Sequence, residues 1–430
     1  MTLNRAALFL GAALLAAVAF AEGEPVPDGL IASPEPGWPQ WRGPRRDGVS
    51  DEKGLLPRWP EEGPKLLWKI GALGRGWSSP IITGGTLYIT GESGADLVIH
   101  ALDLDGKPKW QAKNGAAWKD SWPGARACCA YSEGRLYHMN GHGRVAALDA
   151  ATGKELWAVE VPKRFASPVL TWAMSENLLV DGPRLIVTPG GPKTLVAALD
   201  KLTGETVWTS EPVRGELAAY SSPILFARDG RRVLAGCSSH HGFGVDADTG
   251  KLLWTVPLRN PYGATVMTPV YGDGGVFYAA PDGPEGVLYR IHLSPTEARA
   301  ELLWKTPVDT LTGSGVLVDG SLYAVGCKKT KSLHCVDWKS GQTRYELKLT
   351  AGDTSWAAGA FVWADGRLYG LAEDGSVHLL EPKGEAFEVA GRFQLVPGRV
   401  RDAWAHPVLL DGRLYLRYHD TLWCYDVRGK

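Results

Sequence analysis

The stretch ALDAATGKELW, which runs from Ala147 to Trp157, indicates the fold because close copies of it recur along the chain. It reads as a strand, a tight turn and a second strand, since Asp and Gly favour turns and Gly accepts positive φ angles. The copies are ALDLDGKPKW at 101–110, ALDKLTGETVW at 198–208 and GVDADTGKLLW at 244–254. Each ends in a Trp, whose large ring we expect to pack between neighbouring repeats.

A short hydrophobic strand core recurs in register with these copies. The eight cores begin at Leu87, Leu136, Leu185, Val233, Val276, Leu322, Leu368 and Leu414, so successive cores are 43 to 49 residues apart. This period is typical of a four-stranded propeller blade and not of a helical solenoid. The sequence therefore predicts an all-β protein, an eight-bladed β-propeller with tryptophan-docking repeats.

The last repeat ends after its third strand, and the fourth strand is expected at the other end of the chain. GPKLLW, from Gly63 to Trp68, copies the closing-strand pattern with no strands before it. Such a strand would complete the last blade and remove the exposed edges of an open array. We expect one propeller over residues 63–430, with residues 22–62 as an N-terminal extension that packs on it.

The first residues have the pattern of a secretory signal peptide. Arg5 precedes an apolar run over residues 6–18, and Ala19 and Ala21 fit a small-x-small cleavage site. We therefore expect residues 1–21 to be removed. Because no Cys follows for lipid attachment, we expect a periplasmic or secreted protein without a membrane anchor.

Charge and composition exclude some classes of partner. The chain has 46 Lys and Arg against 47 Asp and Glu, without long runs of like charge. It therefore lacks the electrostatic footprint of a nucleic-acid-binding protein. The 53 Gly, 29 Pro and 18 Trp suit many short strands joined by tight turns. We expect a monomer that does not bind nucleic acid.

The repeats resemble the tryptophan-docking repeat of quinoprotein alcohol dehydrogenases and of the propeller lipoprotein of outer-membrane assembly. WPQWRGPRRDGVS at 38–50, VTPGGPKTLVAALD at 187–200 and WAHPVLLDGRLYLR at 404–417 are similar to exported bacterial PQQ-binding-like propeller proteins. The resemblance covers nearly all of the chain after residue 21 and implies the propeller fold. It does not imply one activity, since one fold hosts many functions.

Aromatic and polar residues precede the innermost strands, where propeller geometry gathers them on one face around the channel. The aromatic candidates are Trp77, Trp122, Trp172, Tyr220, Tyr262, Trp356 and Trp404, and the polar ones are Arg75, Arg126, Glu176, Arg214, Asp353, Arg401 and His406. A mixed aromatic and polar funnel is typical of a site for a small molecule or sugar. The alternative is that these aromatic side chains merely fill the mouth of the channel.

Cys128 and Cys129 lie next to each other at the entry to the second blade. The resemblance implies one role for them, because some quinone-dependent alcohol dehydrogenases hold a disulfide between adjacent cysteines against the cofactor. The simpler interpretation, which we favour, is two small buried residues.

Glu176 falls near the position where the resemblance implies a calcium-binding Glu. Carboxylate oxygen suits Ca²⁺, but no partner Asn or catalytic base is identified in the matching loops. Four further histidines, His138, His142, His240 and His241, lack a metal-ligand spacing motif. The sequence therefore predicts neither a metal site nor a cofactor.

Two classes of function remain. The first is a non-catalytic binding or scaffold protein of the cell envelope, which presents its channel face to a small molecule, a glycan or an envelope protein. The second is a PQQ- and calcium-dependent alcohol or sugar dehydrogenase. We favour the first, since a dehydrogenase needs a metal and a base that the sequence does not identify.

Overall fold

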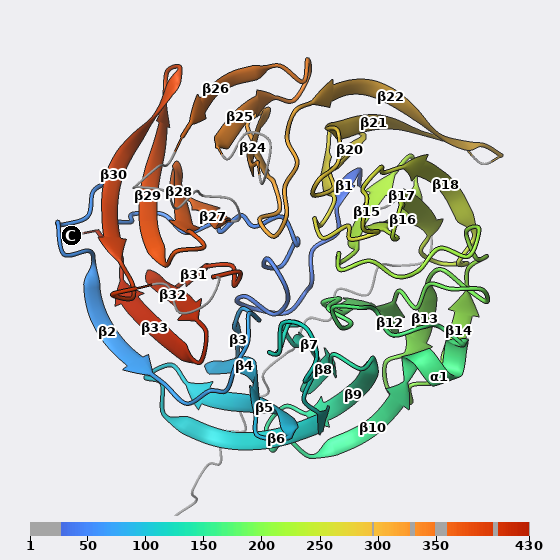
Figure 1. Cartoon of the computed structure of the whole chain (residues 1–430), viewed down its shortest axis with the longest axis horizontal. Coiled ribbons are helices and arrows are strands. Elements are labelled where there is room, and N and C mark those ends of the chain that lie inside the picture. The colour runs from blue at the N-terminus through green and yellow to red at the C-terminus, as the bar shows by residue number, and fades with distance from the viewer. Residues whose placement is uncertain (1–26, 295, 327–331, 349–358, 399–402, 430) are drawn as a thin grey trace, which may run out of the picture.

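The computed structural model describes residues 27–429 except 295, 327–331, 349–358 and 399–402. These residues form eight antiparallel sheets arranged as a ring (Figure 1). The expected all-β, eight-bladed propeller is confirmed. The described part of the chain has one short helix, α1 (Val161–Phe165), and no helix in it is long and apolar enough to cross a membrane.

Each blade has four strands that follow one another outward from the axis, except where the ends of the chain contribute. Blade 1 comprises β3 (Ile81–Thr83), β4 (Thr86–Ser93), β5 (Asp96–Asp103) and β6 (Pro108–Ala116), and blade 2 comprises β7 (Ala130–Ser132), β8 (Arg135–Met139), β9 (Arg144–Asp149) and β10 (Glu155–Glu160). Blade 3 comprises β11 (Leu179–Asp181), β12 (Arg184–Val187), β13 (Ala197–Asp200) and β14 (Thr206–Thr209), and blade 4 comprises β15 (Ile224–Arg228), β16 (Arg231–Cys237), β17 (His241–Asp246) and β18 (Leu252–Pro257). Blade 5 comprises β19 (Val270–Gly272), β20 (Gly275–Tyr278), β21 (Gly286–Leu293) and β22 (Ala298–Thr306), and blade 6 comprises β23 (Val316–Val318), β24 (Ser321–Val325), β25 (Leu333–Asp337) and β26 (Thr343–Leu347). Blade 7 comprises β27 (Ala360–Ala364), β28 (Arg367–Leu371), β29 (Ser376–Lys383) and β30 (Ala386–Gln394), and blade 8 comprises β31 (Val408–Leu410), β32 (Arg413–Tyr418) and β33 (Thr421–Asp426).

Blade 8 takes its outermost strand from the start of the chain. β2 (Lys65–Ile70) pairs antiparallel with β33, with Lys65 opposite Asp426 and Ile70 opposite Leu422. Figure 1 shows the blue β2 lying against the red strands of the C-terminal blade. The expected closure of the ring by an N-terminal strand is therefore confirmed.

Neighbouring blades are joined by the repeated tryptophans. Trp157, in β10, donates its indole N–H to the carbonyl oxygen of Lys201 in the next blade, at 3.1 Å. Its ring lies against Gly204, where a Cβ atom would come within 2.7 Å of the ring. Trp110 and Gly153 repeat this contact one blade earlier. The buried apolar clusters also lie between blades, so the core is distributed around the ring.

The N-terminal extension passes across the middle of the ring (Figure 1). β1 (Gly29–Leu30) first adds a strand to the inner edge of blade 4 by pairing with β15. The chain then forms isolated bridges from Trp38 to Ile82 in blade 1 and from Val49 to Trp363 in blade 7. The segment 38–50 therefore contacts the inner strands of blades on different sides of the ring.

Two buried arginines fix this segment. Arg46 donates hydrogen bonds to the backbone oxygens of Asn177 (2.8 Å), Leu178 (3.1 Å) and Pro223 (2.8 Å), at the starts of the inner strands of blades 3 and 4. Burial lowers its pKa to about 9, so the guanidinium remains charged at neutral pH. A buried charge is tolerated when hydrogen bonds replace its hydration, as these carbonyls do.

Arg42 makes the equivalent contacts on the other side of the axis. Its guanidinium donates to Gly315 O (2.7 Å) at the start of the inner strand of blade 6 and to Asp47 O (2.7 Å) within the extension. The ring of His406, which leads into blade 8, lies 3.5 Å from the same guanidinium. Burial lowers the pKa of Arg42 to about 10. The two arginines thus tie the extension to four blades.

Substituting Gly153 tests the tryptophan docking. Gly153 and Gly134 both have positive φ angles, of 74° and 78°, so Ala introduces similar backbone strain at each. Only at Gly153 would the new Cβ meet an indole, 2.5 Å from Trp110, whereas at Gly134 nothing lies within 4 Å. We expect Gly153→Ala to cost about 2 kcal/mol more than Gly134→Ala in urea denaturation, because overpacking adds to strain. Equal costs would show that the docking contact adds nothing.

Substituting Arg46 tests the anchoring of the extension, with its neighbour as the control. Arg46→Met would leave three buried carbonyl oxygens without their donor, and we expect a loss of about 3 kcal/mol in the free energy of unfolding. Arg45 forms partly exposed ion pairs with Asp47 and Asp51, so Arg45→Met should cost less than about 1 kcal/mol. The measurement is equilibrium unfolding of both variants. Similar values would mean that the arginine contacts do not hold the extension.

Candidate ligand-binding site

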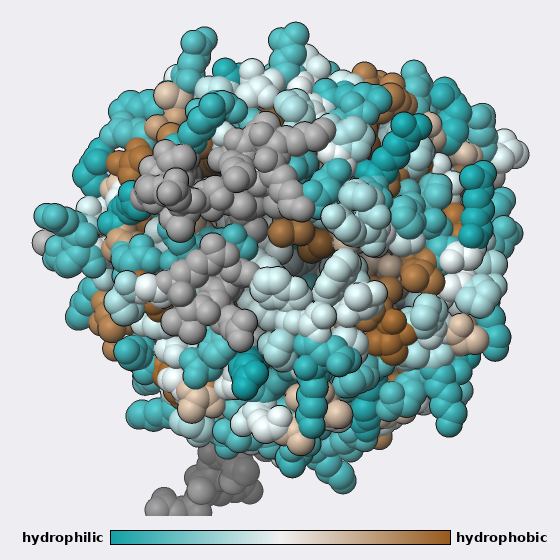
Figure 2. Space-filling model, viewed as in Figure 1, coloured by the Kyte–Doolittle hydropathy of each residue, from teal (hydrophilic) through white to brown (hydrophobic). Residues whose placement is uncertain are grey.

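A cavity of about 430 Å³ lies on the channel face, where the chain enters the inner strands. We call this cavity the aromatic funnel, because seven of its lining residues are aromatic: Trp41, Trp77, Trp122, Trp172, Tyr220, Tyr262 and Trp404. Six of these residues precede inner strands of different blades, and Trp41 comes from the segment that crosses the ring. In the space-filling view, pale and brown residues gather near the middle of the ring, while teal residues dominate its rim (Figure 2).

Three indoles form one wall of the aromatic funnel. The ring centroids of Trp77 and Trp404 are 4.9 Å apart with an angle of 33° between the planes, and those of Trp122 and Trp404 are 5.4 Å apart at 44°. The rings are therefore splayed, and the wall is curved. The Arg126 guanidinium lies 5.4 Å from the centre of the Trp77 ring, in a cation–π contact.

Trp122 is held at the mouth in an unfavourable backbone conformation. Its φ angle is 59° and its side chain is 44% exposed. Arg126 stabilises this conformation by donating hydrogen bonds to Trp122 O (2.5 Å) and Gly124 O (2.6 Å). A left-handed backbone costs a non-Gly residue about 1–2 kcal/mol. Strain of this kind is concentrated at binding and active sites.

The opposite wall and the base combine rings with hydroxyl groups. The rings of Trp172 and Tyr220 lie 5.7 Å apart, and the Trp172 backbone N–H donates to the Tyr220 hydroxyl at 3.2 Å. At the base, the Trp41 indole donates to Thr268 Oγ1 at 3.1 Å, and its ring centroid lies 4.3 Å from that of His406. The extension therefore supplies the end of the cavity.

The structure brings together seven of the residues expected to bind a ligand. Those that line the cavity are Trp77, Trp122, Arg126, Trp172, Tyr220, Tyr262 and Trp404. Cys128, Cys129, Glu176 and His406 are buried and are not among the lining residues. Trp356 lies outside the described residues, as do Asp353 and Arg401. Trp41 was not expected, because the extension does not share the repeat period; its WPQWR sequence is the only signal.

The adjacent cysteines are free thiols just before β7, and both are buried. The backbone N–H of Cys128 donates to Asn177 Oδ1 at 2.6 Å. Burial raises the pKa of Cys128 to about 12 and raises that of Cys129 further above its usual range. A buried thiol with a raised pKa is inert.

Glu176 does not fit the role of a calcium ligand. Its two carboxylate oxygens accept hydrogen bonds from the backbone N–H and the hydroxyl of Thr188, both at 2.8 Å. Calcium takes 6 to 8 oxygens, but the neighbouring Asn177 amide is bonded to Cys128 and Ser222. Across the described ranges, no three His, Cys, Asp or Glu side chains are grouped as metal ligands. The residues present therefore do not fit a quinone–calcium site.

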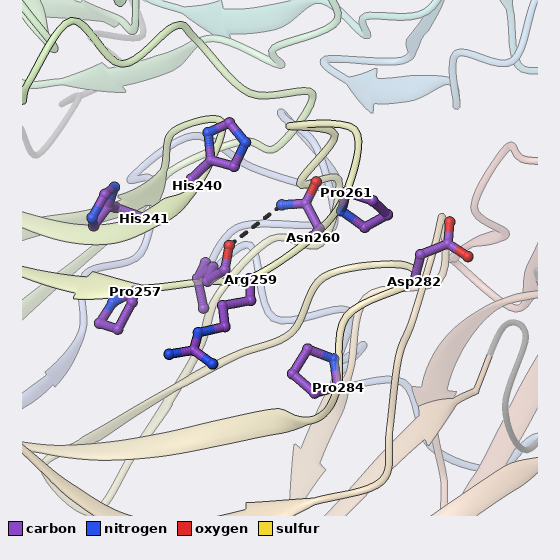
Figure 3. Close-up of a pocket in the computed structure, with 9 residues that line it drawn as sticks. His240, His241, Pro257, Arg259, Asn260, Pro261, Asp282 and Pro284 are labelled. Carbon is purple, nitrogen blue, oxygen red and sulfur yellow. Dashed lines mark hydrogen bonds between the residues drawn. The ribbon is translucent and has the colours of Figure 1, made fainter.

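A second pocket, of about 420 Å³, adjoins the aromatic funnel and shares Asp282 with it. Figure 3 shows Arg259 extending into this pocket, with His240 and His241 on one side and Asp282 on the other. Glu216 accepts a hydrogen bond from the His240 backbone N–H at 2.7 Å, and its carboxylate lies 3.3 Å from Nδ1 of His241. The two histidines are thus held by a carboxylate at the junction of blades 4 and 5.

The fold and the cavity define a tryptophan-docking β-propeller with a ligand-sized funnel on its channel face. The chain belongs to the family described as outer membrane protein assembly factor BamB, whose model matches residues 112–344. It is 25% identical to BamB of Yersinia pestis over 291 residues, which are 63% of this chain and 69% of that protein.

The chain is also similar to quinone-dependent dehydrogenases. A lanthanide-dependent methanol dehydrogenase of Methylacidiphilum fumariolicum is 33% identical over 159 residues, and the match spans 34% of this chain but only 25% of the enzyme. The solved quinohemoprotein alcohol dehydrogenase of Comamonas testosteroni superposes with a TM-score of 0.62 at 14% identity, covering 92% of this chain and 81% of that one. At this identity the superposition shows the fold alone.

The buried Glu176 should make stability depend on pH. Burial raises its pKa from 4.5 to about 7, so the folded state binds an extra proton between these values. Its contribution to stability is therefore present below pH 4.5 and is lost as pH rises through 7. Between pH 5 and pH 8 we expect the wild type to lose about 2 kcal/mol more unfolding free energy than Glu176→Gln, which cannot ionise. Urea denaturation at both pH values measures the difference, and parallel losses would contradict it.

Proposed function

We propose that this chain is a non-catalytic binding propeller of the bacterial cell envelope, and that the aromatic funnel holds its ligand. The observation that carries this proposal is the convergence of seven aromatic rings, from separate segments of the chain, on one open cavity. Aromatic walls with a few polar groups are typical of ligand sites, and the cavity volume falls within their usual range of about 300–1,000 Å³. Trp122 supports the same view, because it has a strained backbone and remains exposed. A tryptophan that only filled the channel mouth would not need to be exposed.

The family supports an envelope role. The Yersinia pestis relative is named an outer membrane protein assembly factor, and a non-catalytic scaffold is compatible with that name. We propose that the present chain is exported by its N-terminal segment 1–21 and acts as a monomer without a membrane anchor. Its ligand would be a small molecule, a glycan or a segment of an envelope protein. We further propose residues 63–430 as the propeller domain and residues 22–62 as its integral extension.

We propose that the chain works without a quinone cofactor. A dehydrogenase of this fold would need a metal to polarise the quinone and a base to accept the alcohol proton. Glu176, which is the candidate metal ligand, is bonded to Thr188 through both carboxylate oxygens. PQQ with calcium as a functional pair is therefore the less favoured alternative.

Four variants test the proposal. In a thermal-shift screen with oligosaccharides, short peptides and PQQ plus CaCl₂, Trp172→Ala and Trp404→Ala should weaken binding of any ligand found at least tenfold, because each removes part of a wall. Cys128→Ala and Cys129→Ala should leave binding unchanged, since both thiols are buried outside the cavity. Equal affinity in all four variants would place binding elsewhere. PQQ-dependent alcohol oxidation that Glu176→Gln abolishes would replace the proposal with the dehydrogenase.

A further inference from the structure

Resting on the proposed function, we infer that the aromatic funnel recognises the end of a neutral oligosaccharide chain. The inference depends on three features of the cavity: its charge, the arrangement of its rings and hydroxyl groups, and its closed end. Each feature distinguishes a sugar from the other ligands that an aromatic cavity accepts.

The lining of the aromatic funnel provides no free cation for an anionic ligand. Arg126 is the basic residue among the described lining residues, and its guanidinium is engaged by Trp122 O, Gly124 O and the Trp77 ring. Carboxylates and phosphates are usually recognised by arginines whose N–H groups point at the ligand. The lining also includes one acidic residue, Asp282. The cavity therefore favours a ligand without negative charge.

The rings and hydroxyl groups match the two kinds of surface on a sugar. A pyranose ring presents C–H bonds on its faces and hydroxyl groups around its edge. The negative face of an indole attracts polarised C–H bonds, and the curved wall of Trp77, Trp404 and Trp122 offers several such faces.

Neutral hydroxyl groups lie where the sugar edge would reach. Ser175, Tyr220, Ser222, Thr268 and Thr312 line the cavity. The Tyr220 oxygen already accepts from Trp172 N–H, which leaves its proton for a ligand. These groups both donate and accept, as sugar hydroxyls do.

The closed end of the cavity favours a chain terminus over a segment that passes through. Trp41 lies on the segment that crosses the ring, and Arg42 and Arg46 anchor that segment on both sides. A proline-rich peptide, by contrast, docks along a groove that is open at both ends. At the mouth, Trp122 is 44% and Tyr262 is 64% exposed, on blades 2 and 5. These two rings lie where the next sugars of the chain would leave the cavity.

The test is a titration of the full chain with defined probes, followed by isothermal calorimetry and tryptophan fluorescence. The neutral probes are hexamers and trimers of glucose, mannose, xylose and N-acetylglucosamine. The comparison probes are hexagalacturonate, which is anionic, and decaproline. We expect at least one neutral hexamer to bind and to change the tryptophan fluorescence, while hexagalacturonate and decaproline do not bind.

Variants locate the binding. Trp404→Ala should lower the affinity for the hexamer at least tenfold. Trp122→Gly and Tyr262→Ala should lower it at least threefold for the hexamer and less for the trimer, because these rings lie at the mouth. Gly adopts the positive φ angle of Trp122 without strain, so we expect the Trp122→Gly variant to fold as the wild type does. The control is Leu202→Ala, an exposed side chain in a turn of blade 3 outside the cavity, which should bind as the wild type does.

Two kinds of result would overturn the inference, and they differ in what else they overturn. If no neutral sugar binds, the neutral-sugar assignment is wrong. If hexagalacturonate or decaproline binds and Trp404→Ala abolishes that binding, the neutral-sugar assignment is wrong but the aromatic funnel stands as a site. If a sugar binds equally well to the wild type, Trp404→Ala and Trp122→Gly, the ligand sits elsewhere. In that case both the sugar assignment and the proposed function fail.

Discussion

Docking of an indole onto the glycine turn of the next blade, as at Trp110 and Trp157, is the constraint on which the rest of the structure depends. The contact between Trp157 and Gly204 combines a hydrogen bond from the indole N–H with a ring face that leaves no room for a Cβ atom. It therefore fixes both the distance and the angle between two sheets. Because similar contacts recur around the ring, the strand entries converge on one face, and the residues that precede the inner strands are brought together.

A ring of this size leaves its middle to be filled, and the sheets do not fill it. The extension does so with Arg42 and Arg46, whose charges are hydrogen-bonded by backbone oxygens at the starts of inner strands. Those oxygens point toward the axis because the inner strands begin there. Filling the middle also sets the depth of the cavity. Trp41, which lines its base, is the residue before Arg42 in the chain, so the anchoring of Arg42 also positions the Trp41 ring. Stability and the shape of the candidate site are thus determined by the same segment.

Much of this arrangement could be predicted from periodicity. The eight blades, the closing strand at Lys65–Ile70 and most of the aromatic lining follow from residues that occupy equivalent places in successive repeats. Trp41 could not be found in this way, because the extension occurs once and has no register with the repeat. The environments of Glu176 and the two cysteines were equally inaccessible, since they depend on contacts with Thr188 and Asn177 that only the folded chain creates.

The pairing of β2 with β33 has a consequence for the order in which the chain folds. Leu66 pairs with Tyr425, so one of the earliest strands to be synthesised must wait for almost the last. Contacts between such distant residues close the largest possible loop and are slow to form. The first seven blades consist of segments that follow one another along the chain, but the ring stays open until β33 pairs with β2. The folding chain therefore remains an incomplete array with free edges for longer than a domain built from local contacts.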